Sequence, residues 1–196
     1  MRKMSFKLLV KVSRPFLVLL PPLIFLASFF YSGASLGLPS IIQLILLSFP
    51  FCVFLYGIND IYDYESDKLN KRKNALEGIK LGKKDHLFIK NSSFIVVLLL
   101  IISSLFTFNL FNILSMLLLI FVSYYYSAPP LRFKERPPLD LISVALAFLA
   151  LIWLGYSFGG TLINIPHKAY FIPFLAIGMN AFCTIMDYSS DKKSRT

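Results

Sequence analysis

The segment YGINDIYDYESDK, residues 56–68, leads from an apolar run directly into a group of acids, and the chain repeats the second half of this segment. Residues 61–68 read IYDYESDK and residues 185–192 read IMDYSSDK, so six of the eight positions are identical. Each copy stands at the end of a long apolar run. The repeat therefore predicts two apolar helices that present the same acidic chemistry at one end.

The composition predicts a membrane protein. The chain has 196 residues, of which 57% are hydrophobic and only 15% charged, and its mean hydropathy is +0.70. A soluble domain of this length cannot bury so much apolar surface, so the lipid bilayer is the expected surrounding. The net charge of +10 comes from basic residues that lie between apolar segments. We therefore expect no nucleic-acid partner.

Six segments are long and apolar enough to cross a bilayer as helices, which requires about 20 residues each. They lie at about 15–32, 40–58, 92–109, 111–127, 139–158 and 169–186. The fold class predicted is therefore all-α, a polytopic membrane protein with six transmembrane helices. Pro21, Pro22 and Pro50 fall inside two of these segments, and we expect them to kink the helices.

The charged residues of the connections predict the orientation. Six crossings bring 19 of the 20 basic residues to one face of the membrane, and only Lys168 falls on the other. All ten acidic residues lie on that same face. Basic loops remain on the cytoplasmic side, so we expect the N-terminus and both acidic repeats of a multi-pass protein of the cell (inner) membrane to be cytoplasmic.

The two acidic repeats have the spacing of metal ligands. Side chains four residues apart share one face of a helix, and like charges at that spacing repel each other unless a cation compensates them. Carboxylate and amide oxygens are hard ligands that suit Mg²⁺, which completes its shell with water and phosphate oxygens. The candidate ligands are Asn59, Asp60, Asp63, Asp67, Asp187 and Asp191. Two such arrays facing each other predict a clamp for a diphosphate; the ordinary alternative is a solvated helix end with surface Asp–Lys pairs.

Four blocks of the sequence resemble the UbiA-type intramembrane prenyltransferases. GINDIYDYESDKLNKRKN, residues 57–74, is similar to the first aspartate-rich motif of that family, NxxxDxxxD, and MDYSSDKKSRT, residues 186–196, to the second, DxxxD. Ser13-Arg14-Pro15 resembles the Arg-Pro start of the first helix. YYYSAPPLRFKERPPLD, residues 124–140, resembles the loop between helices four and five. The blocks occur in family order and span nearly the whole chain.

The resemblance implies a helical bundle that holds Mg²⁺ and an isoprenyl diphosphate, with the metal pulling on the leaving diphosphate so that an allylic cation forms. It implies that four carboxylates are catalytic: Asp63, Asp67, Asp187 and Asp191. It further implies that the diphosphate is bound by Asn59, Arg72, Lys134, Arg132 and Lys192. Lys192 enters this set as a substitute, because Cys183 and Met186 stand where the family has Tyr-x-x-Lys before its second motif. Aromatic faces stabilise cations, and the candidates are Tyr62, Tyr64, Tyr124, Tyr125, Tyr126 and Tyr188, for which an interfacial aromatic belt is the alternative.

The resemblance also predicts the domain and its limits. Enzymes of this family have about nine transmembrane helices, so we expect residues 1–196 to form one UbiA-like domain that is incomplete at its C-terminus. The acceptor is expected to be hydrophobic. SRPFLVLLPP and NDIYDYESDKLN are most similar to the carotenoid-elongating, lycopene elongase-like branch, whose acceptor is a polyene. An aromatic acceptor of the 4-hydroxybenzoate or quinone-precursor type is the alternative.

Two other classes of function stay open from the residues alone. Acids within the membrane mark the path of a transporter. Here they gather at one face, and the middle of the apolar segments carries almost none. The third class is an inactive fragment or a non-catalytic membrane subunit, which would bind no prenyl diphosphate.

Overall fold

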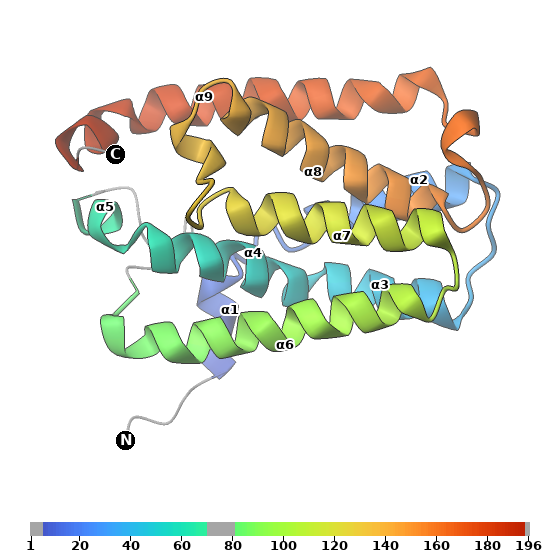
Figure 1. The fold of residues 1–196 in the computed structure, drawn as a ribbon, viewed down its shortest axis with the longest axis horizontal. Coiled ribbons are helices and arrows are strands. Elements are labelled where there is room, and N and C mark those ends of the chain that lie inside the picture. The colour runs from blue at the N-terminus through green and yellow to red at the C-terminus, as the bar shows by residue number, and fades with distance from the viewer. Residues whose placement is uncertain (1–5, 70–80, 195–196) are drawn as a thin grey trace.

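A computed structural model of the chain describes residues 6–69 and 81–194; within these ranges, the side chains of Ser66, Lys68, Leu69 and residues 186–194 are not described. The described residues form α-helices joined by loops and short 3₁₀ turns, without a β-strand. The helices are α1 (Phe6–Val12), α2 (Leu20–Tyr31), α3 (Leu38–Leu47), α4 (Phe49–Tyr62), α5 (Tyr64–Leu69), α6 (His86–Leu105), α7 (Leu110–Tyr125), α8 (Leu139–Tyr156) and α9 (Phe171–Ser194). The long helices run along one direction as an elongated bundle, while α1 stands across it (Figure 1). The all-α prediction is confirmed.

Each of the six predicted spans corresponds to an apolar helix. In the described part of the chain, four are long and apolar enough to cross a membrane: Leu38–Tyr62, Lys83–Leu105, Leu139–Tyr156 and His167–Ile185. Two shorter apolar helices, α2 and α7, correspond to the other two predicted spans. The sequence did not predict α1, which packs against α4.

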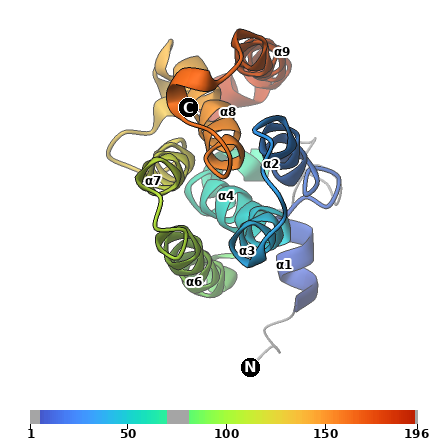
Figure 2. The same ribbon diagram turned by 90° about the vertical axis from the view of Figure 1, so that its right-hand side faces the viewer.

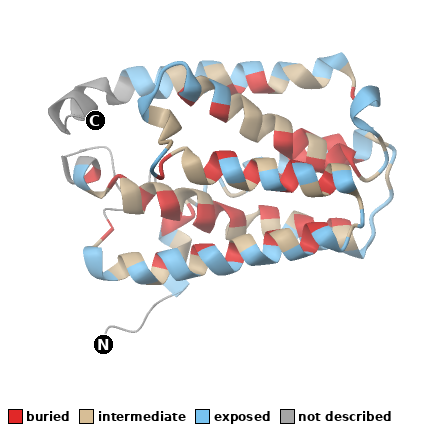
Figure 3. Cartoon of the chain, in the orientation of Figure 1, coloured by how far each residue is buried: buried red, intermediate tan, exposed pale blue. Residues whose placement is uncertain are grey.

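The interior of the bundle is built from aromatic and aliphatic side chains. α8 packs against α2, α7 and α9, while α4 packs against α6 (Figure 2). Phe25 and Phe29 are fully buried and pack their rings against Phe158. The outward faces of the helices are exposed and also apolar (Figure 3); Phe174 of α9, for example, is 70% exposed. Large apolar side chains on the outside of a bundle are satisfied by lipid.

Close approach of α2 and α8 depends on a small residue. A methyl group added to Gly155 would lie 2.2 Å from the carbonyl oxygen of Phe25, which is backbone and cannot turn aside. Three residues along each helix from this contact, Ser28 Oγ donates a 2.6 Å hydrogen bond to the carbonyl oxygen of Ile152. Glycine and serine at such crossings let helix backbones touch, which is the main source of helix association in membranes.

The prolines act differently at the two positions where kinks were predicted. Pro50 lies in the first turn of α4, and the helix is interrupted at Ser48, which ends α3 and begins α4. Pro21 and Pro22 lie in the first turn of α2, which starts at Leu20, later than the sequence predicted. In the first turn of a helix a proline removes no internal hydrogen bond, so this pair begins the helix instead of kinking it.

A network of buried polar side chains joins four helices at the end of the bundle opposite α5. Gln43 of α3 and Asn112 of α7 exchange two hydrogen bonds, of 2.7 and 3.2 Å. Ser104 of α6 donates to Asn112 Oδ1 at 2.5 Å, and Asn112 Nδ2 donates to Ser157 Oγ, at the end of α8, at 2.8 Å. Gln43 is fully buried and Asn112 nearly so. The network therefore fixes this end of the bundle and leaves the other end for the acidic site.

Candidate active site

The first acidic repeat lies where α4 ends. The helix stops at Tyr62, Asp63 is its C-terminal cap, and α5 begins at Tyr64. Although the helix is interrupted, the backbone N–H of Asp63 donates to Asn59 O at 2.9 Å and that of Asp67 donates to Asp63 O at 2.8 Å. The i, i+4 relationship predicted from the sequence is therefore kept across the break. Asp60, Asp63 and Asp67 are all buried.

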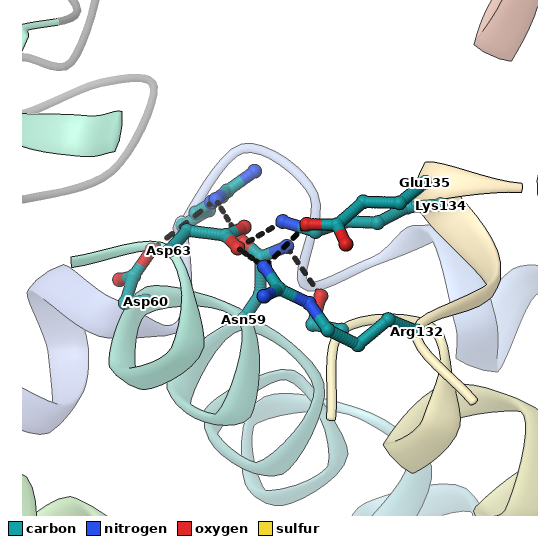
Figure 4. A network of polar contacts seen from close by, with 8 residues as sticks. Asn59, Asp60, Asp63, Arg132, Lys134 and Glu135 are labelled. Carbon is teal, nitrogen blue, oxygen red and sulfur yellow. Dashed lines mark hydrogen bonds and ion pairs between the residues drawn. The ribbon is translucent and has the colours of Figure 1, made fainter. Parts of the chain in front are cut away.

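Two basic side chains from a distant loop meet Asp63. Lys134 Nζ forms a hydrogen bond and ion pair with Asp63 Oδ1 (Figure 4). Arg132 Nη2 lies 3.9 Å from the same oxygen and 2.6 Å from Glu135 Oε1. The loop between α7 and α8 presents these residues because Arg132 adopts a left-handed backbone conformation, with φ of 39°. Both residues were predicted as ligands of a diphosphate, and the structure brings them to the predicted acid.

Arg14 organises the other side of the same acidic segment. Its Nη2 atom donates to Asn59 Oδ1 and pairs with Asp60 Oδ1, at 3.4 Å in each case. Its guanidinium group lies over the ring of Tyr56, 4.2 Å from the centroid. These contacts were not predicted; the Arg-Pro pair before the first long apolar segment was the available signal. Ser127 Oγ accepts a 2.9 Å hydrogen bond from Asn59 Nδ2, so both ends of the Asn59 amide are held.

The second acidic repeat approaches the first through its backbone. α9 continues as a helix to Ser194, and its contacts include α5, which carries Asp67. Figure 1 shows α5 and the C-terminal end of α9 side by side at the left end of the bundle. The side chains of Asp187, Asp191 and Lys192 lie outside the described part, and so does the whole of Arg72. The structure thus brings the two repeats to one end of the bundle without describing how their side chains meet.

Three consecutive tyrosines at the end of α7 point in different directions. The hydroxyl groups of Tyr62 and Tyr124 are 3.4 Å apart. The ring of Tyr125 packs against Phe121 at 5.0 Å. The hydroxyl of Tyr126 donates instead to Asn180 Oδ1 of α9, at 3.3 Å. Tyr124 and Tyr125 also pack against each other, with ring centroids 5.1 Å apart, so only Tyr126 of the three bonds to α9 among the described contacts.

An apolar cavity of about 710 Å³ opens beside Tyr62 and Tyr124. It lies between α4, α6 and α7 and is walled almost entirely by apolar side chains. Phe54, Ile58, Phe94, Val97, Leu118 and Phe121 are among its lining residues. Lys90 supplies the one charged side chain in the described lining. A volume of this size suits an elongated hydrophobic group.

The oxygens at the end of α4 suit a hard cation. Asn59, Asp60, Asp63 and Asp67 offer amide and carboxylate oxygens, the ligands that Mg²⁺ prefers. Among the described residues, no three His, Cys, Asp or Glu side chains converge closely enough to form a complete metal site. Asp187 and Asp191, the other predicted ligands, belong to the stretch whose side chains are not described. In the described part, cationic side chains of Lys134, Arg132 and Arg14 compensate the acids.

Together, the apolar helices and the charged cluster at one end of the bundle are the features of an integral membrane protein. The chain belongs to the UbiA prenyltransferase family, whose pattern matches residues 19–195. The resemblance drawn from the four sequence blocks is therefore confirmed.

Several curated relatives have names that refer to carotenoid biosynthesis. A lycopene elongase/hydratase of Corynebacterium glutamicum is 38% identical over a match that covers 57% of this chain and 39% of that protein. One from Haloarcula japonica is 34% identical over 95% of this chain and 63% of that protein. The C(50) beta-cyclic carotenoids biosynthesis protein LbtBC of a Dietzia species is 29% identical over 87% of this chain and 40% of that protein. The chain thus spans between about two fifths and two thirds of the length of these relatives.

Solved structures show the same fold. The structure of a UbiA homolog from Archaeoglobus fulgidus bound to DMAPP and Mg²⁺ matches with a TM-score of 0.78 and 26% sequence identity. A structure of that homolog bound to GPP and Mg²⁺ matches with a TM-score of 0.74. The first match covers 95% of this chain and 66% of the homolog.

Proposed function

We propose that this chain acts as an integral-membrane prenyltransferase, which moves an isoprenyl group from an allylic diphosphate to a hydrophobic acceptor. The observation that carries the proposal is the convergence at Asp63, where an acidic helix end meets Lys134 and Arg132 of a distant loop. Clustered carboxylates with cationic side chains beside them bind a metal and an anion together. Membership of the UbiA family supports the same reading.

Mg²⁺ is the proposed cofactor. The A. fulgidus homolog was solved with Mg²⁺ and prenyl diphosphates, and the predicted ligands of this chain carry hard oxygen donors. Asn59, Asp63 and Asp67 would hold the metal from one side, with Asp60 beside them, and Asp187 and Asp191 from the other. When bound, the metal neutralises the charge that develops on the leaving diphosphate. Lys134 and Arg132, which pair with Asp63, would then also bind phosphate oxygens of the diphosphate. Arg72 and Lys192 complete the proposed diphosphate-binding set.

The apolar cavity between α4, α6 and α7 is the proposed place for the isoprenyl chain. Tyr62 lines the cavity and is the residue before Asp63, so an anchored diphosphate would have its hydrocarbon tail directed toward this space. The cavity offers about 710 Å³, and hydrocarbon gains free energy there by leaving water. Tyr62 and Tyr124 present oxygen atoms and ring faces at its rim, where an allylic cation is stabilised.

The reaction that follows is an electrophilic alkylation. The allylic C–O bond breaks and its electron pair leaves with the diphosphate. A π pair of the acceptor then forms the new C–C bond with the allylic carbon. We propose a polyene acceptor of the lycopene type, which is supported by the names of the relatives.

The orientation proposed is cytoplasmic for the acidic end. The positive-inside rule favours it, because the connections at this end carry nearly all basic residues. Isoprenyl diphosphates are charged and do not cross a bilayer, so a site at this face would receive them directly from the cytoplasm.

The test uses the full chain in lipid nanodiscs with Mg²⁺ and labelled dimethylallyl diphosphate, offered lycopene in one arm and 4-hydroxybenzoate in the other. We expect label in lycopene, and Asp63→Asn should reduce the rate at least about 100-fold, because the Mg²⁺ that would neutralise the leaving diphosphate loses a carboxylate ligand. Asp85→Asn is the matched control, since Asp85 lies at the start of α6 and makes no capping hydrogen bond through its side chain. Label in 4-hydroxybenzoate instead would show that the acceptor is aromatic and that the proposed polyene acceptor is wrong. No label transfer by the unmodified chain would refute the proposal.

A further inference from the structure

Asp140 is a buried carboxylate that the diphosphate site does not use. It stands in the first turn of α8, directly after the loop that carries Arg132 and Lys134, and is 8% exposed. Among the described residues, its Oδ1 atom is buried and has no hydrogen-bond partner. The N-terminal end of a helix stabilises a negative charge, which accounts for an acid at this position. It does not account for an oxygen without a partner, because that arrangement costs free energy.

A second buried polar atom without a described partner belongs to the same neighbourhood. Asn180 of α9 accepts the hydrogen bond of the Tyr126 hydroxyl through Oδ1, while its Nδ2 atom is buried and, within the described part of the chain, unsatisfied. The Tyr126 hydroxyl also lies within electrostatic range of both Asp140 and Asp63. Asp140 Oδ1 on α8 is thus an acceptor without a described partner, and Asn180 Nδ2 on α9 is a donor without one. Both residues interact with Tyr126.

We propose that Asp140 and Asn180 hold a water molecule that ends the prenyl-transfer reaction. A water donates to a carboxylate oxygen and accepts from an amide N–H, so a single molecule satisfies both orphaned atoms. The buried position keeps this water apart from bulk solvent. This inference rests on the proposed prenyl transfer and concerns the step after the new C–C bond has formed.

The chemistry of that step requires a base or a nucleophile. When an allylic cation adds to a double bond of a polyene, the positive charge moves to the more substituted carbon of that bond. The cation is quenched if a neighbouring C–H bond gives its electron pair to a new double bond and its proton to the held water, which passes a proton to Asp140. It is quenched alternatively if the water oxygen bonds to the cationic carbon and one water proton moves to Asp140. Neither route needs an oxidant or a reductant.

The proposed water would lie beside Tyr126 and α9, apart from the proposed place of the isoprenyl chain. Tyr124 and Tyr125 line the apolar cavity beside α4 and α6, which is the proposed place of the isoprenyl chain. Tyr126 points away from them, toward α9. Tyr62, the neighbour of the diphosphate anchor Asp63, lines that cavity, whereas the Tyr126–Asn180 pair does not belong to its lining. A polyene approaching along α8 and α9 would bring its cationic carbon to the water after bond formation.

The experiment follows the unmodified chain, Asp140→Asn and Asn180→Leu in nanodiscs with Mg²⁺, dimethylallyl diphosphate and lycopene in ¹⁸O-labelled water. It measures binding of the prenyl diphosphate, release of diphosphate, and the ratio of alkene to alcohol products by mass spectrometry. We expect both variants to bind prenyl diphosphate normally. Asp140→Asn should slow product formation at least about tenfold, and both variants should change the alkene-to-alcohol ratio, which a purely structural role would not move.

The outcomes separate this inference from the proposed function. Absence of transfer by the unmodified chain overturns the proposed function. Transfer with an unchanged product ratio and rate in Asp140→Asn overturns the water site alone, as does equal loss of prenyl-diphosphate binding in Asp140→Asn and Asp140→Glu. An experimental structure that resolves ordered water gives an independent test, because it should show one molecule in hydrogen-bond contact with Asp140 Oδ1 and Asn180 Nδ2. A described apolar or basic side chain in that place would refute the site.

Discussion

The ammonium group of Lys134 pairs with the carboxylate of Asp63, although 71 residues separate them in the sequence. The pair fastens the loop between α7 and α8 to the end of α4 (Figure 4). It also compensates part of the charge of a buried carboxylate, together with Arg132. A loop that reaches the acid in this way is positioned to meet any anion that the acid binds through a metal.

The first prediction concerns that lysine. Lys134→Gln should weaken binding of a prenyl diphosphate about ten- to 100-fold, because a hydrogen bond to a charged group contributes about 1.5–3 kcal/mol. Isothermal titration with a non-hydrolysable dimethylallyl diphosphate analogue and Mg²⁺ measures the change. Lys84→Gln is the matched control, because it removes the same charge from a lysine that is exposed near the start of α6. Equal affinities for the two variants would contradict the role given to Lys134.

The second prediction concerns Arg14, which contacts Asn59 and Asp60 through one guanidinium nitrogen and stacks on Tyr56. Arg14→Lys keeps the charge but loses the planar group that makes these contacts together. We expect the Mg²⁺ concentration for half-maximal turnover to rise about tenfold, because Asn59 and Asp60 would no longer be held in place.

Arg136→Lys provides the comparison for Arg14. Arg136 donates to the carbonyl oxygen of Pro130 at an exposed site, so its replacement should leave the Mg²⁺ dependence unchanged. If Arg14→Lys also leaves the Mg²⁺ dependence unchanged, only the charge of Arg14 matters and the positioning role is wrong.

The third prediction concerns the crossing of α2 and α8. Gly155→Ala would place a methyl group 2.2 Å from Phe25 O, so the two helices must move apart. We expect a loss of about 1–3 kcal/mol in stability, the usual cost of overpacking, seen as a lower midpoint of thermal unfolding in detergent. Gly178→Ala on α9 is the control, because no heavy atom lies within 4 Å of the added methyl group. Equal unfolding midpoints for the two variants would show that α2 and α8 can separate freely.

Much of the fold could be predicted from the sequence because lipid imposes a simple rule. Backbone groups in a bilayer must be hydrogen-bonded within the chain, so long apolar segments become helices. Within the described residues, each of the six segments that it identified is helical, the second as the consecutive helices α3 and α4. It did not reveal α1, whose seven residues are too few for a periodic signal, nor the interruption of the acidic helix at Asp63. Both depend on local packing and capping that composition does not encode.

Of the candidate site, the sequence identifies residue types but only some of their contacts. Spacing identified Asn59 and Asp63, and the family-like loop identified Arg132 and Lys134, all of which the structure brings together. The sequence did not assign the contacts of Arg14, because its partners lie 45 and 46 residues away. Pairings over such distances follow from the packing of α1 and α4 and leave no periodic trace in the chain.

The last prediction concerns the buried network at the opposite end of the bundle, where the two amides of Gln43 and Asn112 have unequal numbers of partners. Asn112→Leu should cost more stability than Gln43→Leu. Asn112→Leu removes both described hydrogen bonds of the Gln43 amide, which is fully buried. The leucine at position 43 leaves Asn112 its hydrogen bonds with Ser104 and Ser157.

A double-mutant cycle measured by unfolding in detergent tests this asymmetry. Each broken side-chain hydrogen bond between membrane helices costs about 1 kcal/mol, so Asn112→Leu should lose more than that and Gln43→Leu about that much. In the Asn112→Leu background, Gln43→Leu should cost nothing or stabilise, because it removes an amide that already lacks its described partners. Asn91→Leu, at an exposed position of α6, controls for the change of an amide to an alkyl group. Additive losses would show that Gln43 finds other partners, and the network would then be a set of independent contacts instead of one unit.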